Sequence, residues 1–271
     1  MPMTNSQNAP RIFSVANQKG GVGKTTTTVN LATSLAAVGK KTLIIDLDPQ
    51  GNASTGLGIE HAARENGAYE ILFGECTLAE AAHKTKVPGL SIITSTVDLA
   101  GAEIELIEAE DREARLKKSI ENSGLEFDYI LFDCPPSLNL LTLNALVASD
   151  GVIVPLQCEF YALEGISHLV KTVERVRNSF NSDLALQGIV LTMYDKRNNL
   201  SFQVEHDVRD HFGDVVYDTV IPRNVRVSEA PSFGLPAIVY DMTCSGSQAY
   251  LRLAKELLRR EKNIKKEKEA A

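Results

Sequence analysis

A glycine-rich segment near the start of the chain restricts the fold more than any other feature. The segment comprises Lys19, Gly20, Gly21, Val22, Gly23, Lys24, Thr25 and Thr26, and it lies between an apolar run at 11–15 and a helical pattern at 26–38. In this context glycines turn backbone N–H groups inward to form a nest for phosphate oxygens, and the following helix adds the positive end of its dipole. The segment therefore predicts a phosphate-binding loop, in which Lys24 reaches the β- and γ-phosphates and the Thr25 hydroxyl is a ligand of Mg²⁺.

Apolar runs rich in β-branched residues alternate with helical patterns along the chain. The runs lie at 11–15, 42–45, 90–93, 129–132, 152–156 and 186–191, and the helical patterns between them include 26–38, 99–119, 163–176 and 202–211. Such alternation is typical of a parallel sheet that is covered on both faces. We therefore predict an α/β fold of the P-loop nucleotidase type, with a doubly wound, mostly parallel sheet and helices on both faces. Ligands of such folds bind at the carboxyl ends of the strands.

The domain organisation is expected to be simple. The sequence has no internal repeat and no Gly/Ser linker, so one domain is predicted over 11–260. Residues 1–10 are expected to form a flexible N-terminal tail, and residues 261–271 a charged C-terminal tail that frays from the last helix. No run approaches the roughly 18 apolar residues of a membrane span, and the start lacks the features of a signal peptide. We expect a cytoplasmic protein that does not bind membranes.

Charge and cysteine usage narrow the classes of function. The net charge of −7 argues against indiscriminate coating of nucleic acid, because that affinity comes mainly from Lys and Arg. The net charge does not exclude a local basic patch, since positive charge concentrates late in the chain, at Lys196 and Arg197, at Arg223 and Arg226, and over 252–268. The four cysteines lie far apart without CxxC spacing, which favours reduced thiols over a zinc site or disulfides.

Carboxylates follow two of the predicted strands. Asp46 and Asp48 come directly after the run at 42–45, and Asp133 ends the run at 129–132. Because carboxyl ends of parallel strands share one edge of a sheet, all three are expected beside the phosphate loop. Asp48 is predicted to orient or deprotonate the attacking water, Asp46 to hold Mg²⁺ through its water shell, and Asp133 to polarise that shell as a Walker B residue. Capping of a turn is the alternative role for each.

The loop departs from the usual phosphate-loop pattern. Gln18 stands where a glycine is usual, and Lys19 adds a second lysine. The sequence KGGVGKTT resembles the deviant Walker A box of the family that contains ParA, MinD and the nitrogenase iron protein. This resemblance implies that Lys19 reaches across an ATP-dependent homodimer to the partner's ATP and stabilises charge on the transferred phosphoryl group. A lysine that only solvates the loop is the alternative. ATP and Mg²⁺ are the cofactors that the resemblance implies.

Later segments resemble the ParA branch of this family. The stretches DxDPQGN at 46–52 and DCPPS at 133–137 resemble its switch regions, and the block at 221–232 resembles its signature and not that of MinD or the iron protein. The resemblance implies that Met193 and Pro222 supply apolar faces for adenine, with Arg223 as a lid. It also implies that Arg197 and Arg226 contact DNA without sequence preference, since guanidinium groups suit phosphates. Ordinary strand-end packing and solvated surface arginines are the respective alternatives.

The resemblance extends from residue 12 to about residue 258, and it identifies the chain as a member of the ParA-type chromosome-partitioning ATPases. It implies a slow ATPase that is stimulated by a ParB-like centromere-binding protein. Its ATP-bound dimer is expected to bind non-specific double-stranded DNA of the nucleoid and to partition a chromosome, or a plasmid. A MinD-like membrane-associated positioning ATPase is an alternative, although beyond Leu258 only Ile264 offers a bulky apolar anchor. A nucleotide switch that recruits protein partners, and a metabolic enzyme with a small-molecule acceptor, are the others.

Overall fold

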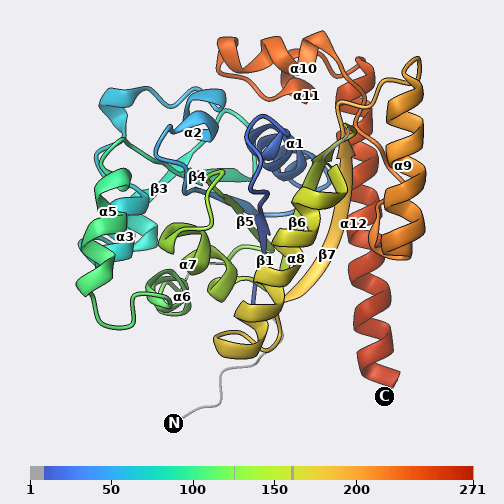
Figure 1. The fold of residues 1–271 in the computed structure, drawn as a ribbon. Helices are drawn as coiled ribbons and strands as arrows, with labels where there is room; N and C mark the ends of the chain where they lie inside the picture. The colour runs from blue at the N-terminus through green and yellow to red at the C-terminus, as the bar shows by residue number, and fades with distance from the viewer. Residues whose placement is uncertain (1–8, 125, 160–161, 271) are drawn as a thin grey trace.

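One mixed sheet forms the centre of the molecule. The computed structural model describes residues 9–124, 126–159 and 162–270 (Figure 1). The strands in these residues are β1 (Arg11–Val15), β2 (Thr42–Asp46), β3 (Ala82–Lys84), β4 (Leu90–Ile93), β5 (Tyr129–Asp133), β6 (Gly151–Gln157) and β7 (Ala185–Thr192). Their order is β3-β4-β2-β5-β1-β6-β7, and every neighbouring pair is parallel except β3 with β4. The predicted doubly wound, mostly parallel sheet is confirmed.

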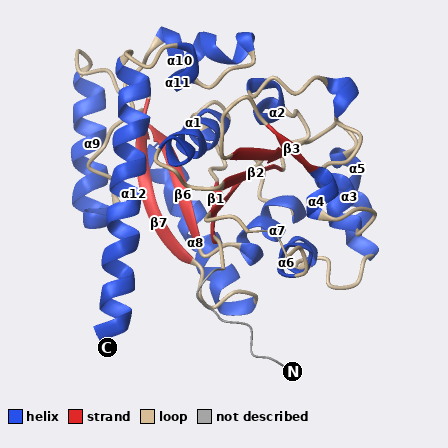
Figure 2. Ribbon diagram, turned by 180° about the vertical axis from the view of Figure 1, so that it is seen from behind, coloured by secondary structure: helices blue, strands red, loops and turns tan. Residues whose placement is uncertain are grey.

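Helices cover both faces of this sheet. They are α1 (Lys24–Ala37), α2 (Asn52–Gly56), α3 (Ala68–Phe73), α4 (Leu78–Ala81), α5 (Leu99–Glu105), α6 (Arg115–Glu121), α7 (Leu140–Ala148), α8 (Ala162–Ser179), α9 (Asn199–Phe212), α10 (Val225–Glu229), α11 (Ala237–Tyr240) and α12 (Ser245–Ala270). Short 3₁₀ helices lie at His61–Ala63, Leu106–Glu108, Gly213–Val215 and Ala230–Phe233. Figure 1 shows α8 in front of the sheet, and Figure 2, seen from behind, shows α12 in front of it. The two helices therefore lie on opposite faces.

The alternation of side chains along a strand divides the core into two parts. Leu43 and Ile45 of β2 are buried in a cluster with residues of α3, α6, α7 and α8. Ile44, which lies between them, belongs to a second cluster with residues of α1 and α12. Because successive side chains of a strand point to opposite faces, a central strand that is covered on both sides must be apolar throughout. This explains why the central strands are continuous apolar runs.

The helical pattern predicted over 99–119 is interrupted in the structure. α5 passes into a 3₁₀ helix that ends at Glu108, and α6 starts only at Arg115. Leu106 and Leu116 on the two sides of the break are both fully buried. In a continuous helix ten positions rotate a side chain by roughly 280°, about 80° away from its starting direction. The break therefore lets both leucines face the same core, which the sequence pattern could not show.

The described C-terminal residues are helical, whereas most of the expected N-terminal tail lies outside the described part of the chain. α12 continues to Ala270, so residues 261–270, expected to fray as a charged tail, continue the helix. Glu261 ties this part to β1, because its carboxylate accepts a hydrogen bond from Arg11 Nε at 2.5 Å. Of the predicted flexible tail at 1–10, residues 1–8 lie outside the described part of the chain. Over the described ranges no helix has the length and hydropathy to cross a membrane.

Candidate nucleotide site

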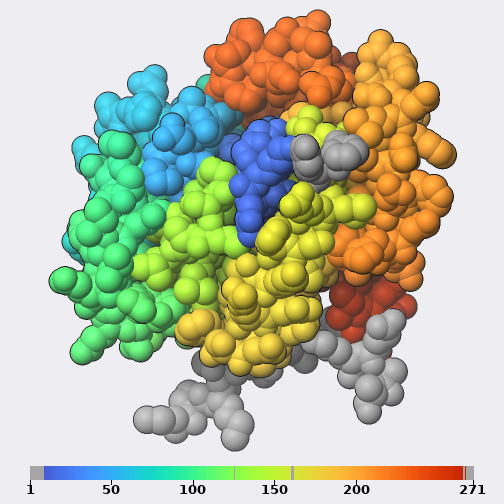
Figure 3. Space-filling view, viewed as in Figure 1, coloured from blue at the N-terminus to red at the C-terminus, as the bar shows by residue number. Residues whose placement is uncertain are grey.

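The glycine-rich loop joins the carboxyl end of β1 to α1. Gly21 and Gly23 have φ angles of +75° and +90°, a left-handed conformation that glycine adopts without steric cost. Val22 is buried, and its carbonyl accepts a hydrogen bond from Thr192 Oγ1 at 2.8 Å, which fixes the loop to the end of β7. Gly20 and Gly21 are exposed. Figure 3 shows the blue segment that contains the loop at the surface, between the yellow and the orange segments. The loop is thus rigidly anchored and accessible from solvent.

Lys24 is held inside this loop. Its side chain is buried, and Nζ donates a hydrogen bond to the Lys19 carbonyl at 3.0 Å. Burial lowers the pKa of Lys24, although the charge of Asp133 acts in the opposite direction. A buried ammonium at the amino end of a helix forms a strongly electropositive point. The loop is therefore prepared for a polyanion such as a chain of phosphates.

Asp46 and Asp133 lie next to each other on neighbouring strands. They pair in the register of β2 with β5, and both are fully buried. Asp46 Oδ2 accepts hydrogen bonds from Ser54 Oγ at 2.7 Å and from the Ser54 N–H at 2.9 Å. Burial raises the pKa of Asp46 to about 6, against the effect of the Ser54 hydrogen bonds. Burial and the charge of Asp46 also raise the pKa of Asp133 well above its ordinary value.

The surroundings of Asp133 fit a divalent cation. Its Oδ1 accepts a hydrogen bond from Thr28 Oγ1 at 3.2 Å, and the Thr25 hydroxyl also hydrogen-bonds to this carboxylate. Its other oxygen, Oδ2, is buried and has no hydrogen-bond partner in the described part of the chain. A buried carboxylate that carries a charge must be compensated by a hydrogen bond, an ion pair or a metal. Magnesium takes one or two carboxylates together with phosphate oxygens and waters, which this set of groups matches.

Asp48 follows β2 and faces the same edge of the sheet. Only 9% of the residue is exposed, so Asp48 is almost completely enclosed at this edge. Its Oδ1 accepts a hydrogen bond from the Gln50 N–H at 3.0 Å. Its carbonyl accepts one from the Gly51 N–H at 2.8 Å, which closes a turn. Asp48 is therefore held in place by the loop that follows it, with only a small part of the residue open to solvent.

Lys19 points to a carboxylate of its own chain. Its ammonium group forms an ion pair with Glu159, which lies two residues beyond the end of β6. The side chain of Lys19 remains 45% exposed. Its backbone N–H donates to Asn17 Oδ1 at 3.0 Å, so the start of the loop is fixed while the side chain extends outward. Lys19 is therefore accessible to solvent but already forms an ion pair with Glu159 of its own chain.

The residues predicted to surround adenine meet beside the loop. Met193 follows β7 with a φ angle of +51°, an uncommon conformation for a residue with a side chain. A Cβ atom on Gly23 would lie 3.9 Å from Met193 Cε, so Met193 packs against the loop. Tyr194 pairs with Pro222 in an isolated parallel bridge, and the Arg223 N–H donates to the Tyr194 carbonyl at 3.1 Å. These contacts bring Met193, Pro222 and the exposed Arg223 to the same side of the site.

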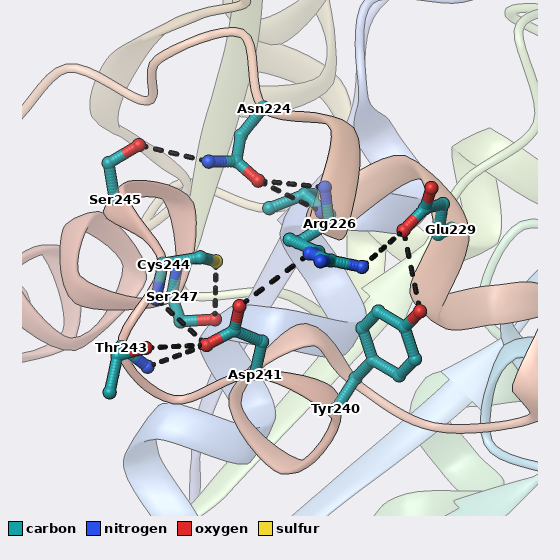
Figure 4. A network of polar contacts seen from close by, with 10 residues as sticks. Asn224, Arg226, Glu229, Tyr240, Asp241, Thr243, Cys244, Ser245 and Ser247 are labelled. Atoms are coloured by element: carbon teal, nitrogen blue, oxygen red, sulfur yellow. Dashed lines mark hydrogen bonds and ion pairs between the residues drawn. The ribbon is translucent and has the colours of Figure 1, made fainter.

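Both arginines predicted to bind DNA are exposed, and both face carboxylates. Arg197 is 89% exposed and contacts Asp195 through two parallel contacts of 3.0 and 2.9 Å, which lower the pKa of Asp195 to about 2. Arg226 belongs to α10 and is 55% exposed. Figure 4 shows its guanidinium between Glu229, at 3.1 Å, and Asp241, at 3.8 Å. Any anion that binds these arginines must compete with carboxylates of the same chain.

Several residues of the site were not predicted from the sequence. Thr28 lies one helical turn after Lys24, so its spacing could have indicated a side chain that faces Asp133. Glu159 follows the end of β6, a position that indicates the edge of the sheet where the site lies but not a pairing with Lys19. Ser54, which binds Asp46, and Arg64, which contacts Gly51 in the segment after β2, carry no comparable local signal. They reach the site through tertiary packing.

Comparisons with known proteins agree with this geometry. A family model described as an AAA domain matches residues 10–186. The chromosome partitioning protein ParA of Caulobacter vibrioides is 58% identical over 260 residues, which cover 95% of this chain and 97% of that protein. The sporulation initiation inhibitor protein Soj of Bacillus subtilis is 53% identical over 247 residues, 91% of this chain and 98% of that one. The chain belongs to the ParA/Soj family of chromosome-partitioning ATPases.

Solved structures place the family fold among nucleotide-binding proteins. Cobyrinic acid a,c-diamide synthase from Mycobacterium smegmatis, solved with a bound ATP analog and magnesium, has a TM-score of 0.82 and 37% identity to this chain. The match covers 94% of this chain and 96% of that protein. ParA/Soj membership confirms the resemblance that the deviant Walker A box and the block at 221–232 indicated.

Proposed function

We propose that this chain is an ATPase whose ATP-bound homodimer binds non-specific double-stranded DNA and partitions a chromosome or plasmid. In this proposal a ParB-like partner stimulates its slow hydrolysis, and the ATP-bound protein associates with the nucleoid. The observation that supports it most is the convergence of Lys24, Asp46 and Asp133 at the end of three strands, beside an accessible glycine loop. Family membership supports the partition function, since the more similar relatives are chromosome-partitioning proteins.

ATP would be held mainly by the loop and its surroundings. The backbone N–H groups of residues 19–26 would receive the phosphates, with the Lys24 ammonium on the β- and γ-phosphates. Met193 and Pro222 would contact the faces of adenine, and the exposed Arg223 would cover it. Binding of phosphates would also satisfy Lys24, whose pKa is lowered by burial in the absence of an anion.

Thr25, Asp46 and Asp133 would hold magnesium. Bound together with ATP, this ion would neutralise charge on the phosphate oxygens. The unpartnered Oδ2 of Asp133 supports this assignment. The raised pKa values of both aspartates have the same implication, because two buried carboxylates on adjacent strands repel each other unless a cation lies nearby. Thr28 and Ser54 would orient the two carboxylates.

Hydrolysis would depend on Asp48 and Lys19. Asp48 would orient or deprotonate the attacking water, since its carboxylate lies directly after β2 and is held by the turn that follows it. Lys19 would leave Glu159 and reach the ATP of the second protomer, where its charge stabilises the transferred phosphoryl group. Lys19 is half-exposed and paired with Glu159 within the monomer. Because its proposed target lies on the second protomer, this role requires dimerisation. Binding, assembly and turnover would thus be coupled.

DNA binding would use the exposed arginines of each protomer. Arg197 and Arg226 offer guanidinium groups that can form paired contacts with phosphate oxygens. Each protomer has a net charge of −7 and its arginines face carboxylates, so a single patch would bind weakly. Two patches joined in one dimer would bind cooperatively, which makes DNA binding dependent on ATP. Its affinity should fall steeply with salt.

Three other functions have less support. The synthase from Mycobacterium smegmatis shows that a metabolic enzyme shares this fold, but its 37% identity is well below the 58% of the partitioning relative. A MinD-like protein would need an amphipathic membrane anchor, and Ile264 of α12 is 39% exposed among charged neighbours. A nucleotide switch that recruits proteins would share the ATP site. It would differ from the proposal in not binding DNA.

Nucleotide-dependent dimerisation tests the assembly that the proposal requires. Light scattering should give a mass near the 29.5 kDa of one chain with ADP or no nucleotide, and twice that mass with Mg²⁺ and a non-hydrolysable ATP analog. Lys24→Ala should remain monomeric under both conditions, because the phosphates lose their buried cation. Lys171→Ala, on an exposed part of α8, is the matched control and should behave as the unchanged protein. A mass that does not respond to nucleotide would contradict the proposed dimer.

A further inference from the structure

Arg64 is a buried arginine to which the proposed ATP site assigns no role. Its residue is 4% exposed, and it follows the 3₁₀ helix His61–Ala63. No carboxylate of the described residues lies within ion-pair distance of it. Taking a guanidinium out of water costs several kcal/mol unless its donors are satisfied. A charge in this position therefore has to be held by hydrogen bonds.

The guanidinium meets this requirement entirely with neutral oxygens. Nε and one terminal nitrogen donate to the Ile59 carbonyl at 3.1 and 2.7 Å. The same terminal nitrogen donates to Thr55 Oγ1 at 2.8 Å, and the other donates to the carbonyls of Gly51 and Ser95 at 3.4 and 3.2 Å. These five contacts match the five N–H donors of an arginine fork. Arg64 thus clasps the segment between Gly51 and Ile59 against the end of β4.

This segment directly follows the turn that carries Asp48. The Gly51 N–H donates to the Asp48 carbonyl at 2.8 Å. Gly51, which Arg64 contacts, is therefore hydrogen-bonded directly to Asp48. The same segment supplies Ser54 to Asp46, and the Ser95 N–H donates to Ser54 Oγ at 3.2 Å. Arg64 and Ser54 therefore fix the segment to the β4 end at two separate points.

Gly51 shows how closely the guanidinium approaches the backbone. It has a φ angle of +61°, and a Cβ atom at this position would lie 2.6 Å from Arg64 Nη1 and 2.9 Å from the Ser95 carbonyl oxygen. Both the conformation and the contact exclude a side chain. The turn after Asp48 is therefore shaped around the arginine, and its path would change if the guanidinium were absent.

We propose that Arg64 is a positioning residue for ATP hydrolysis, which holds the turn at Gly51 and thereby sets the place of the Asp48 carboxylate relative to the phosphate loop. This inference rests on the proposed role of Asp48 in hydrolysis. Arg64 forms no hydrogen bond with the glycine loop or with Lys24 in the described residues, although its charge also acts on Asp46. Its loss should therefore impair turnover much more than ATP binding. A displacement of about 1 Å at a reacting group is enough to cost a factor on the order of 100 in rate.

The test compares turnover, ATP binding and folding in two variants. Arg64→Ala should lower kcat about 10- to 100-fold with KM for ATP within about threefold, and millimolar methylguanidinium should restore part of kcat by occupying the vacated space. Arg64→Lys keeps the charge but loses the fork, so it should show an intermediate loss, and it serves where the alanine variant does not fold. Arg260→Ala is the matched control, since Arg260 binds the carbonyls of Asp214 and Val216 away from the site. It should lower the melting temperature without lowering kcat.

The outcomes separate this inference from the proposed function. A kcat in the Arg64 variants equal to that of the unchanged protein overturns the inference alone, because the unchanged protein still hydrolyses ATP. A loss of kcat that methylguanidinium does not restore, and that the Arg260→Ala control shares, also overturns it, because it then reflects general destabilisation. If the unchanged protein does not hydrolyse ATP at all, both this inference and the proposed function are contradicted.

Discussion

Replacing Asp48 with alanine should lower kcat for ATP hydrolysis by at least about 100-fold, while the Kd for ATP changes by less than about threefold. The carboxylate accepts a hydrogen bond from the Gln50 N–H, and among the described residues it forms no ion pair with Lys24, although its charge acts on both Lys24 and Asp133. Its removal should therefore cost the orientation or deprotonation of water and not the binding of phosphates. Phosphate release under saturating ATP measures the first quantity, and titration with a fluorescent ATP analog measures the second.

The control for this substitution is Asp218→Ala. Asp218 is 79% exposed, pairs with Arg259 on α12, and takes no part in the site. Its loss should leave both quantities unchanged. Because the Asp48 variant would bind ATP without consuming it, its dimer should also persist for longer than that of the unchanged protein. Hydrolysis at the normal rate in the Asp48 variant would remove this residue from the mechanism.

Charge reversal at Arg226 should weaken DNA binding by at least about tenfold without disturbing the nucleotide-dependent dimer. A glutamate there removes a phosphate contact from both patches of the dimer and adds repulsion in its place.

The contact of Arg226 with Glu229 leads to the opposite expectation, stronger DNA binding, for a second variant. Glu229→Gln should raise DNA affinity a few fold, because the arginine then loses one of its two competing carboxylates.

Arg177→Glu provides a charge-matched control for Arg226→Glu. Arg177 is exposed in the last turn of α8, whereas α10 lies over the opposite end of the sheet (Figure 1). It should alter DNA affinity far less than the change at Arg226, although it changes the net charge equally. Fluorescence anisotropy with a short non-specific duplex measures all three proteins. Equal effects at Arg177 and Arg226 would show that overall charge, and not the patch, determines binding.

Sequence patterns predicted the parts of this structure that depend on local order. Glycines between a strand and a helix indicated the phosphate loop, and apolar runs that end in Asp46 and Asp133 indicated the strands that carry the carboxylates. Periodicity could not predict that β2 and β5 are neighbours in register, because strand order depends on the packing of the whole sheet. Fold-level knowledge of where ligands bind supplied that step.

The features that were not predicted depend on contacts between distant segments. β3 is a three-residue antiparallel strand at the edge, too short for a periodic signal. Arg64 meets Ser95 across 31 positions of the sequence, and Lys19 meets Glu159 across 140, so no local pattern could indicate either pair. Arg226 of α10 likewise forms an ion pair with Asp241, 15 positions later in the sequence. Its guanidinium must therefore leave this carboxylate before it can bind a phosphate.

The most direct test of the central claim is the binding of Asp48→Ala to non-specific duplex DNA with ATP, with ADP and without nucleotide, in low and in moderate salt. The variant prevents turnover, so the ATP state lasts through the measurement. We expect tight binding with ATP alone, and a steep loss of affinity as the salt concentration rises. No binding under any of these conditions would contradict the DNA-partitioning function, and it would favour a switch that recruits proteins. Equal binding with and without ATP would contradict the coupling between the nucleotide site and DNA.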